Sequence, residues 1–129
     1  MVVKKVEESL LTPFGLRTLA PSDPAYRPSY EGSPEERASA YHNGTVWPWL
    51  LGHFVEAKLK TAENPPSAAK KLENALVAIE NHLDDAGLGT VSEIFDGDAP
   101  HAPRGSIGQA WSVAEILRAT ILIRKAKGE

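Results

Sequence analysis

The sequence predicts an all-α protein, and three observations support this fold class. Apolar residues recur at helical spacing in three segments, which begin near residues 45, 67 and 107. A strand-like pattern is weak and is confined to residues 91–95. The chain has 129 residues, the size of one domain or of one piece of a larger domain. We therefore expect residues 1–129 to form a single domain.

Prolines divide the N-terminal third of the chain. Six of the ten prolines fall between Pro13 and Pro48. Proline lacks a backbone N–H donor and disfavours a helical conformation at the residue before it. Residues 12–45 are therefore expected to be extended or turning, with short helical pieces at most. Long loops of this kind in compact domains are often functional.

The first expected helix begins near Thr45, whose hydroxyl can cap it, and tolerates Pro48 in its first turn. Residues 64–66, Asn-Pro-Pro, end it. Its apolar face consists of five residues, Trp47, Leu50, Leu51, Phe54 and Val55.

The second expected helix is capped by Ser67 and ends at Gly87 or Gly89. Its apolar stripe is Leu72, Leu76, Ile79 and Leu83, at spacings of four, three and four residues. The third expected helix covers residues 107–125 and is apolar on more than one side, so it should pack against two neighbours or a partner chain. His53 is expected to be a hydrogen-bonded or surface side chain rather than a ligand, and His82, beside the second stripe, is expected to be exposed.

Charge and composition exclude several classes of protein. The formal net charge is −3 with no basic stripe, so we expect no nucleic-acid partner. The chain has no cysteine, which excludes disulfides, thiolate-bound zinc and a cysteine nucleophile. No apolar run approaches the roughly 20 residues that cross a bilayer, and the charged N-terminus is unlike a signal peptide. We expect a cytoplasmic protein without a membrane partner or a cofactor.

An aromatic loop at residues 41–49 is the first candidate functional segment. Flat aromatic faces can stack on sugar rings, while amide and imidazole groups can bind sugar hydroxyls. The alternative interpretation is a helix cap followed by core tryptophans, because buried tryptophan usually belongs to a core. The side chains concerned are Tyr41, His42, Asn43, Trp47 and Trp49.

An acidic loop at residues 92–105 is the second candidate. It contains Glu93, Asp96, Asp98, His101 and Arg104. A carboxylate held against a water beside a scissile bond can act as a general base. Asp96 and Asp98 could instead bind a hard cation, although their spacing matches only part of a calcium-binding loop. A solvated acidic turn without function is the third interpretation.

Four strings link these loops to a known family. They are GLRTL at residues 15–19, YHNGTVWPW at 41–49, SEIFDG at 92–97 and QAWSVAE at 109–115. Together, and in this order, they resemble the C-terminal part of glycogen debranching enzymes, the amylo-α-1,6-glucosidase region. The resemblance covers roughly residues 14–118. This chain departs from the family pattern at Asn43, where the family more often has glutamine, and at residues 106–108.

The resemblance implies a fold and a reaction. The fold would be part of an (α/α)6 barrel, in which inner and outer helices alternate around a sugar-binding mouth. The reaction would be hydrolysis of α-1,6-linked glucose at glycogen branch points, by an inverting mechanism with two acidic residues. Glu93 would be the general base that deprotonates the attacking water. The residues expected to bind the glucan substrate are Tyr41, His42, Asn43, Trp47, Trp49, Asp96, His101 and Arg104.

The general acid of the family lies upstream of the matched region, so the resemblance leaves open whether this chain alone is an enzyme. Three helices also fall short of a complete barrel, and uncovered apolar faces favour association. We therefore expect a homo-oligomer, or a complex with a chain that supplies the remaining helices. Three functions remain: an active glucosidase, a non-catalytic α-glucan-binding or accessory module, and a structural subunit that binds no sugar.

Overall fold

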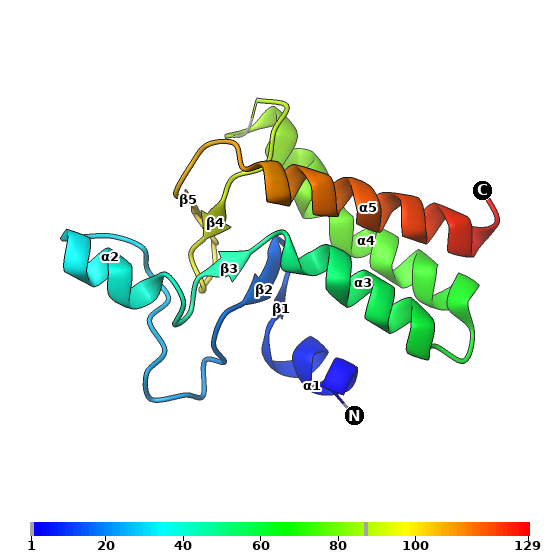
Figure 1. Ribbon diagram of the computed structural model, residues 1–129, viewed down its shortest axis with the longest axis horizontal. Coiled ribbons are helices and arrows are strands. Elements are labelled where there is room, and N and C mark those ends of the chain that lie inside the picture. The colour runs from blue at the N-terminus through cyan, green and yellow to red at the C-terminus, as the bar shows by residue number, and fades with distance from the viewer. Residues whose placement is uncertain (1, 87) are drawn as a thin grey trace.

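The computed structural model describes residues 2–86 and 88–129 and combines helices with a small antiparallel sheet (Figure 1). Within this part of the chain the helices are α1 (Val2–Ser9), α2 (Pro34–Ala40), α3 (Leu50–Thr61), α4 (Pro65–Asp84) and α5 (Ala110–Lys127). The strands are β1 (Leu11–Thr12), β2 (Gly15–Arg17), β3 (Val46–Trp47), β4 (Ile94–Phe95) and β5 (Pro103–Arg104).

The sheet overturns the predicted fold class. Its five strands are ordered β1-β2-β3-β4-β5 and every neighbouring pair is antiparallel. Leu16 lies opposite Trp47, and Val46 lies opposite Phe95. The prediction of an all-α segment of an (α/α)6 barrel is therefore wrong. Strands of two or three residues are too short to show an alternating pattern, which needs four or more residues to stand out.

The three long helices form a layer beside the sheet. Helix α5 packs against both α3 and α4, as its apolar residues on several sides predicted (Figure 1). Burying an aliphatic side chain of this size contributes about 1.5–3 kcal/mol. The core of the layer includes Leu51, Phe54, Val55, Leu72, Leu76, Ala119 and Ile123, and Leu16 joins it from β2.

The first long helix begins later than predicted, at Leu50 rather than near Thr45. Residues Val46 and Trp47 are extended because they pair with β2 and β4. The hydroxyl of Thr45 donates to the carbonyl of Tyr41 at 2.8 Å, so it does not cap α3. This places the aromatic loop on the sheet rather than on a helix.

Helix α4 begins at Pro65, two residues before the predicted cap, because the Asn64 side chain accepts a hydrogen bond from Ser67 N at 3.0 Å. The helix ends at Asp84. Of the two predicted stops, Gly87 lies outside the described residues. Gly89 has a φ of +88°, in the left-handed region, and its N–H donates to the carbonyl of Leu83 at 2.7 Å.

Two short helices and the C-terminal end of α5 complete the fold. Helix α2 lies within the proline-rich stretch and has a capping box, in which Ser33 and Glu36 bond each other's backbone N–H groups. Helix α1, which the sequence analysis missed, contacts α3 and β1. Gly128 ends α5 in the left-handed conformation. Among the described helices none is long and apolar enough to cross a membrane.

Candidate functional site

Glu93 lies immediately before β4, and both of its carboxylate oxygens are engaged. The Tyr41 hydroxyl donates to Oε1, and the Ser106 backbone N–H donates to Oε2 at 2.8 Å. The β4–β5 hairpin brings residue 106 opposite residue 93, since Ile94 pairs with Arg104 and Glu93 N donates to Ser106 O at 3.0 Å. Hydrogen bonds to a carboxylate are among the stronger ones in proteins. The Glu93 side chain is thus held in one orientation while half-exposed.

Gly105 makes room for this carboxylate. Its φ is +69°, in the region that favours glycine. A Cβ added at this position would lie 2.6 Å from Glu93 Oε2 and 3.1 Å from Glu93 Cβ. The glycine is therefore required both by its backbone conformation and by the closeness of Glu93.

Gly105→Ala is expected to displace the Glu93 side chain and to lower the free energy of unfolding by roughly 1–3 kcal/mol, the usual cost of backbone strain. Denaturant unfolding of the two proteins measures the loss. Gly89→Ala is the control, because Gly89 has a similar φ of +88° but a Cβ there would meet nothing within 4 Å. Equal losses in both variants would show that the space beside Glu93 has no effect of its own.

Tyr41 joins Glu93 to the aromatic loop. Its ring centroid lies 4.9 Å from that of Trp47, 4.7 Å from that of His42 and 5.6 Å from that of Tyr30. The indole Nε1 of Trp47 donates to the carbonyl of Tyr41 at 3.1 Å and anchors the turn. Desolvation by burial, followed by the bond to Glu93, raises the Tyr41 pKa from 10.0 to about 12. The phenol therefore remains a hydrogen-bond donor throughout the neutral pH range.

The raised pKa of Tyr41 predicts how the stability of the fold depends on pH. A raised folded-state pKa means that the protonated phenol stabilises the fold fully below about pH 10, the ordinary tyrosine pKa. That contribution is lost as the pH rises through about 12. In Glu93→Gln the pKa of Tyr41 should fall, because the neighbouring negative charge is gone. NMR of labelled tyrosine rings measures this titration. An unchanged Tyr41 pKa in the variant would contradict the contact with Glu93.

Arg104, Asp96 and Glu31 form a second group of charged side chains in the candidate site. The Arg104 guanidinium donates to Asp96 Oδ2 from Nε at 3.0 Å and from Nη2 at 2.8 Å, and Nη2 also bonds Glu31. The backbone N–H of Tyr30 donates to the other Asp96 oxygen at 2.9 Å. The hydrogen bonds that Arg104 donates to Asp96, more than any other cause, raise the pKa of Arg104. This cluster fastens the proline-rich stretch to the β4–β5 hairpin.

The structure brings together some of the predicted site residues. Glu93 and Tyr41 are bonded, Trp47 and His42 lie against Tyr41, and Asp96 is bonded to Arg104. The imidazole of His42 is exposed and stacks on Trp47, with centroids 5.5 Å apart and an interplanar angle of 11°. Trp47 itself is buried, with 7% of its surface exposed, so it supports the loop rather than offering a free face.

Other predicted residues have different neighbours. The Trp49 ring lies against Trp111 and His53, at 5.6 and 5.5 Å between centroids. The exposed Asn43 amide donates to the carbonyl of Ser39 at 2.8 Å. His101 Nδ1 lies 2.9 Å from the carbonyl of Asp96, and the ring is buried beside Phe14.

In the structure, the two aspartates of the acidic loop that could have bound a hard cation have separate partners. Asp96 is bonded to Arg104 and to the N–H of Tyr30, while Asp98 accepts a hydrogen bond from the Tyr26 hydroxyl at 2.9 Å. Among residues 2–86 and 88–129, no three histidine or acidic side chains gather as they would to hold a metal ion.

Three structural partners were missed by the sequence analysis. Ser106 and Tyr30 act through backbone N–H groups, for which no side-chain pattern gives a signal. His82, expected at the surface, is only 4% exposed, and Ser92 N donates to its Nε2 at 3.2 Å. Its position three residues after Ile79, on the buried side of α4, is the signal that could have revealed its burial.

Comparison with known proteins assigns this chain to a family that is described as a glucosidase. A sequence model described as Amylo-alpha-1,6-glucosidase matches residues 1–118. The chain belongs to this amylo-alpha-1,6-glucosidase family, as its four strings predicted.

One curated relative gives a more specific comparison than the family model. The chain is 29% identical, over 130 residues, to the glycogen debranching enzyme of Saccharomyces cerevisiae. The alignment covers 86% of this chain and 8% of the relative, so the chain spans a small part of that protein's length. The prediction of a debranching-enzyme-related segment is confirmed.

Proposed function

We propose that this chain supplies the water-activating carboxylate of an α-1,6-glucosidase site, and that the substrate is the α-1,6-linked glucose at a glycogen branch. The observation that supports this most directly is the double anchoring of Glu93 by Tyr41 and the N–H of Ser106. An ionised carboxylate offers about four lone-pair sites, so two bonds leave sites to receive a water proton. The side chain is also half-exposed, as a group that meets water must be.

In the proposed step a water oxygen attacks the anomeric carbon while Glu93 takes its proton. The glycosidic C–O bond breaks, and the departing sugar oxygen receives a proton from a general acid outside this chain. An inverting site keeps the two carboxyl groups roughly 6.5–9.5 Å apart to leave room for the water. Tyr41 stays protonated and acts as a positioning residue, because its hydroxyl fixes one oxygen of Glu93. The exposed ring of His42, beside Tyr41, would face the sugar.

We further propose that residues 1–129 form one domain that works together with further chain segments. The test is to insert this chain in place of the matching segment of the yeast debranching enzyme and to replace Glu93 by alanine. Azide needs no general base, so added azide should restore turnover and yield β-glucosyl azide. α-Glucosyl azide, or unchanged glucose release without azide, would contradict the proposed role.

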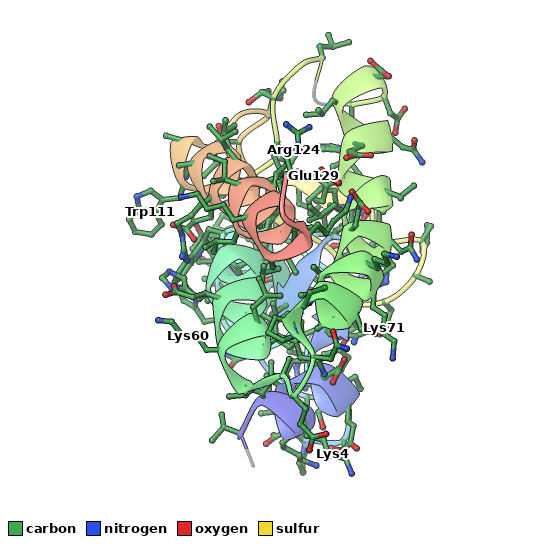
Figure 2. All side chains as sticks on the ribbon, turned by 90° about the vertical axis from the view of Figure 1, so that its right-hand side faces the viewer. Lys4, Lys60, Lys71, Trp111, Arg124 and Glu129 are labelled. Atoms are coloured by element: carbon green, nitrogen blue, oxygen red, sulfur yellow. The ribbon has the colours of Figure 1, made fainter. Side chains whose placement is uncertain are left out.

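A second candidate function is α-glucan binding without hydrolysis, and an exposed tryptophan favours it. Trp111 has 62% of its surface exposed and projects from the start of α5 (Figure 2). It contacts Trp49, so the two rings together offer an aromatic surface that a sugar ring could cover. On this hypothesis maltooligosaccharide binding survives Glu93→Gln and is lost in Trp111→Ala. The glucosidase proposal predicts that Glu93→Gln weakens the response to a transition-state mimic such as 1-deoxynojirimycin.

We also propose that the outer face of α5 is covered by another polypeptide. Val113, Leu117 and Ile121 recur every four residues along this face and are 41%, 60% and 44% exposed. A contiguous apolar stripe of this kind favours association.

Light scattering after size exclusion is expected to give more than one chain per particle, and Leu117→Lys with Ile121→Lys should yield the monomer. The matched control is Lys70→Glu with Glu80→Lys on α4, where both side chains are exposed. A monomeric parent that binds no hydrophobic dye would contradict the covered face.

A further inference from the structure

A cavity of about 450 Å³ lies between α4 and the turn of the β4–β5 hairpin. This volume falls within the range of about 300–1,000 Å³ that is typical of small-molecule sites. Its chemistry is set by six of its lining residues, Phe14, Asn81, His82, Asp85, Phe95 and His101. Glu93 is not among the lining residues, whereas His101, one of the residues predicted from the sequence to bind substrate, is.

Two buried histidines give the cavity a donor and an acceptor. The N–H of Ser92 donates to His82 Nε2 at 3.2 Å, so in the neutral ring the proton is on Nδ1. His101 Nδ1 faces the Asp96 carbonyl at 2.9 Å, which only accepts, so Nε2 of the neutral ring is an acceptor. Among the described residues neither His82 Nδ1 nor His101 Nε2 has a hydrogen-bond partner.

Both imidazoles are held in place, and most of each side chain is buried. His82 is 4% exposed and His101 is 9% exposed. Burial lowers the pKa of His82, which favours the neutral form of its ring. The unpaired nitrogen of each ring keeps some accessible surface, so water or a ligand hydroxyl can satisfy it. The cavity that both rings line is where such a partner can enter.

Aromatic rings join the two histidines. Phe14 stacks on Phe95, with centroids 4.5 Å apart, and its centroid lies 6.4 Å from that of His82 and 5.9 Å from that of His101. Phe14 is half-exposed, so part of its ring remains open to the cavity. The arrangement is an apolar surface with one donor and one acceptor beside it.

The charges of the lining residues indicate which class of ligand the cavity can bind. The lining contains no lysine or arginine, and Asp85 is its acidic residue, so an anion such as a phosphate would meet no cation. A neutral ring with an apolar face and neighbouring hydroxyls fits instead, because a hydroxyl can accept from His82 and donate to His101. A pyranose has both features.

We propose that this cavity binds one neutral pyranose ring, a glucose unit of an α-glucan. The pyranose class follows from the cavity, whereas its identity as a glucan unit rests on the proposed function. A glucan chain bound here would remain attached while branches are presented to the anchored carboxylate.

Maltotriose is the probe. NMR of the imidazole nitrogens follows its binding to the intact chain, and His82 Nδ1 and His101 Nε2 are expected to shift with one saturation curve. Ala78 also lines the cavity, and Ala78→Leu fills it without touching a polar group. This variant should raise the dissociation constant about tenfold or more. Val77→Leu, one residue along α4 and 47% exposed outside the lining, should leave it unchanged.

The outcomes separate this proposal from the one about Glu93. Glu93→Gln should leave maltotriose binding at the histidines intact, whatever it does to hydrolysis. Histidine shifts that vanish in Glu93→Gln would show that a single site accounts for both, and would overturn the proposal. Shifts that persist unchanged in a folded Ala78→Leu, or their absence in the parent, would also overturn it. If Ala78→Leu does not fold, nuclear Overhauser contacts between maltotriose and Phe14 in the parent decide, and their absence refutes the site.

Discussion

Glu93→Gln is expected to lower glucose release from a glycogen limit dextrin by roughly 10²–10⁴-fold, the usual contribution of a general base. The measurement uses a chimeric yeast debranching enzyme in which this chain replaces the matching segment. Glutamine keeps the volume of the side chain and an oxygen to accept the hydrogen bond of Tyr41, but it cannot take a proton from water. The loss should therefore appear in kcat, with KM nearly unchanged.

Glu63→Gln is the matched control for this result. Glu63 is exposed just after α3, and no hydrogen bond or ion pair of its side chain is found in the described part of the chain. It should leave kcat unchanged. Equal kcat values for the parent and Glu93→Gln would exclude Glu93 as the base. A rise in KM alone would assign it to ground-state binding instead.

Leu51→Ala is expected to lower the free energy of unfolding by about 2–5 kcal/mol, a large share of the 5–15 kcal/mol typical of a domain. Leu51 is 1% exposed and belongs to the core between α3, α4 and α5. The truncation removes buried apolar surface and leaves a cavity that packed neighbours fill only in part. Urea unfolding of the isolated chain, followed by circular dichroism, measures the loss.

Leu117→Ala makes the same chemical change on the outer face of α5, where Leu117 is 60% exposed. In the dissociated chain it should alter the free energy of unfolding by about 0.5 kcal/mol or less. If the two variants were equally destabilised, the core would not lie between the three helices. If only Leu117→Ala were destabilised, α5 would present its other face to the layer.

The sequence predicted the long helices better than the sheet. The stripe from Leu72 to Leu83 repeats the helical period along the C-terminal part of α4, and Leu72, Leu76 and Ile79 are buried as expected, whereas Leu83 is only partly buried. The strands carry two or three residues each, and the neighbours that make them a sheet are distant in sequence. Thr45 resembled a helix cap for the same reason, because its local pattern gave no sign that Val46 pairs with Arg17 and Phe95.

The candidate site was only partly predictable. Glu93 and Tyr41 were predicted as site residues because the residues around them form strings that resemble a family, and the structure joins the two side chains by a hydrogen bond. Ser106 was not found, since its contribution is a backbone N–H aimed by the β4–β5 hairpin. Trp49 looked like a neighbour of Trp47 from its spacing of two residues. A chain turn at Pro48, between β3 and α3, leaves it beside Trp111 instead.

The anomeric form of the first glucose released tests the central claim most directly. If Glu93 deprotonates a water that attacks the anomeric carbon from the side opposite the leaving oxygen, the α-linkage yields β-glucose. Proton NMR, recorded before mutarotation and with the yeast enzyme carrying this chain, distinguishes the two anomers. The account predicts β-glucose as the first product. α-Glucose would mean that Glu93 does not act as the base of a single direct displacement, and would contradict the account.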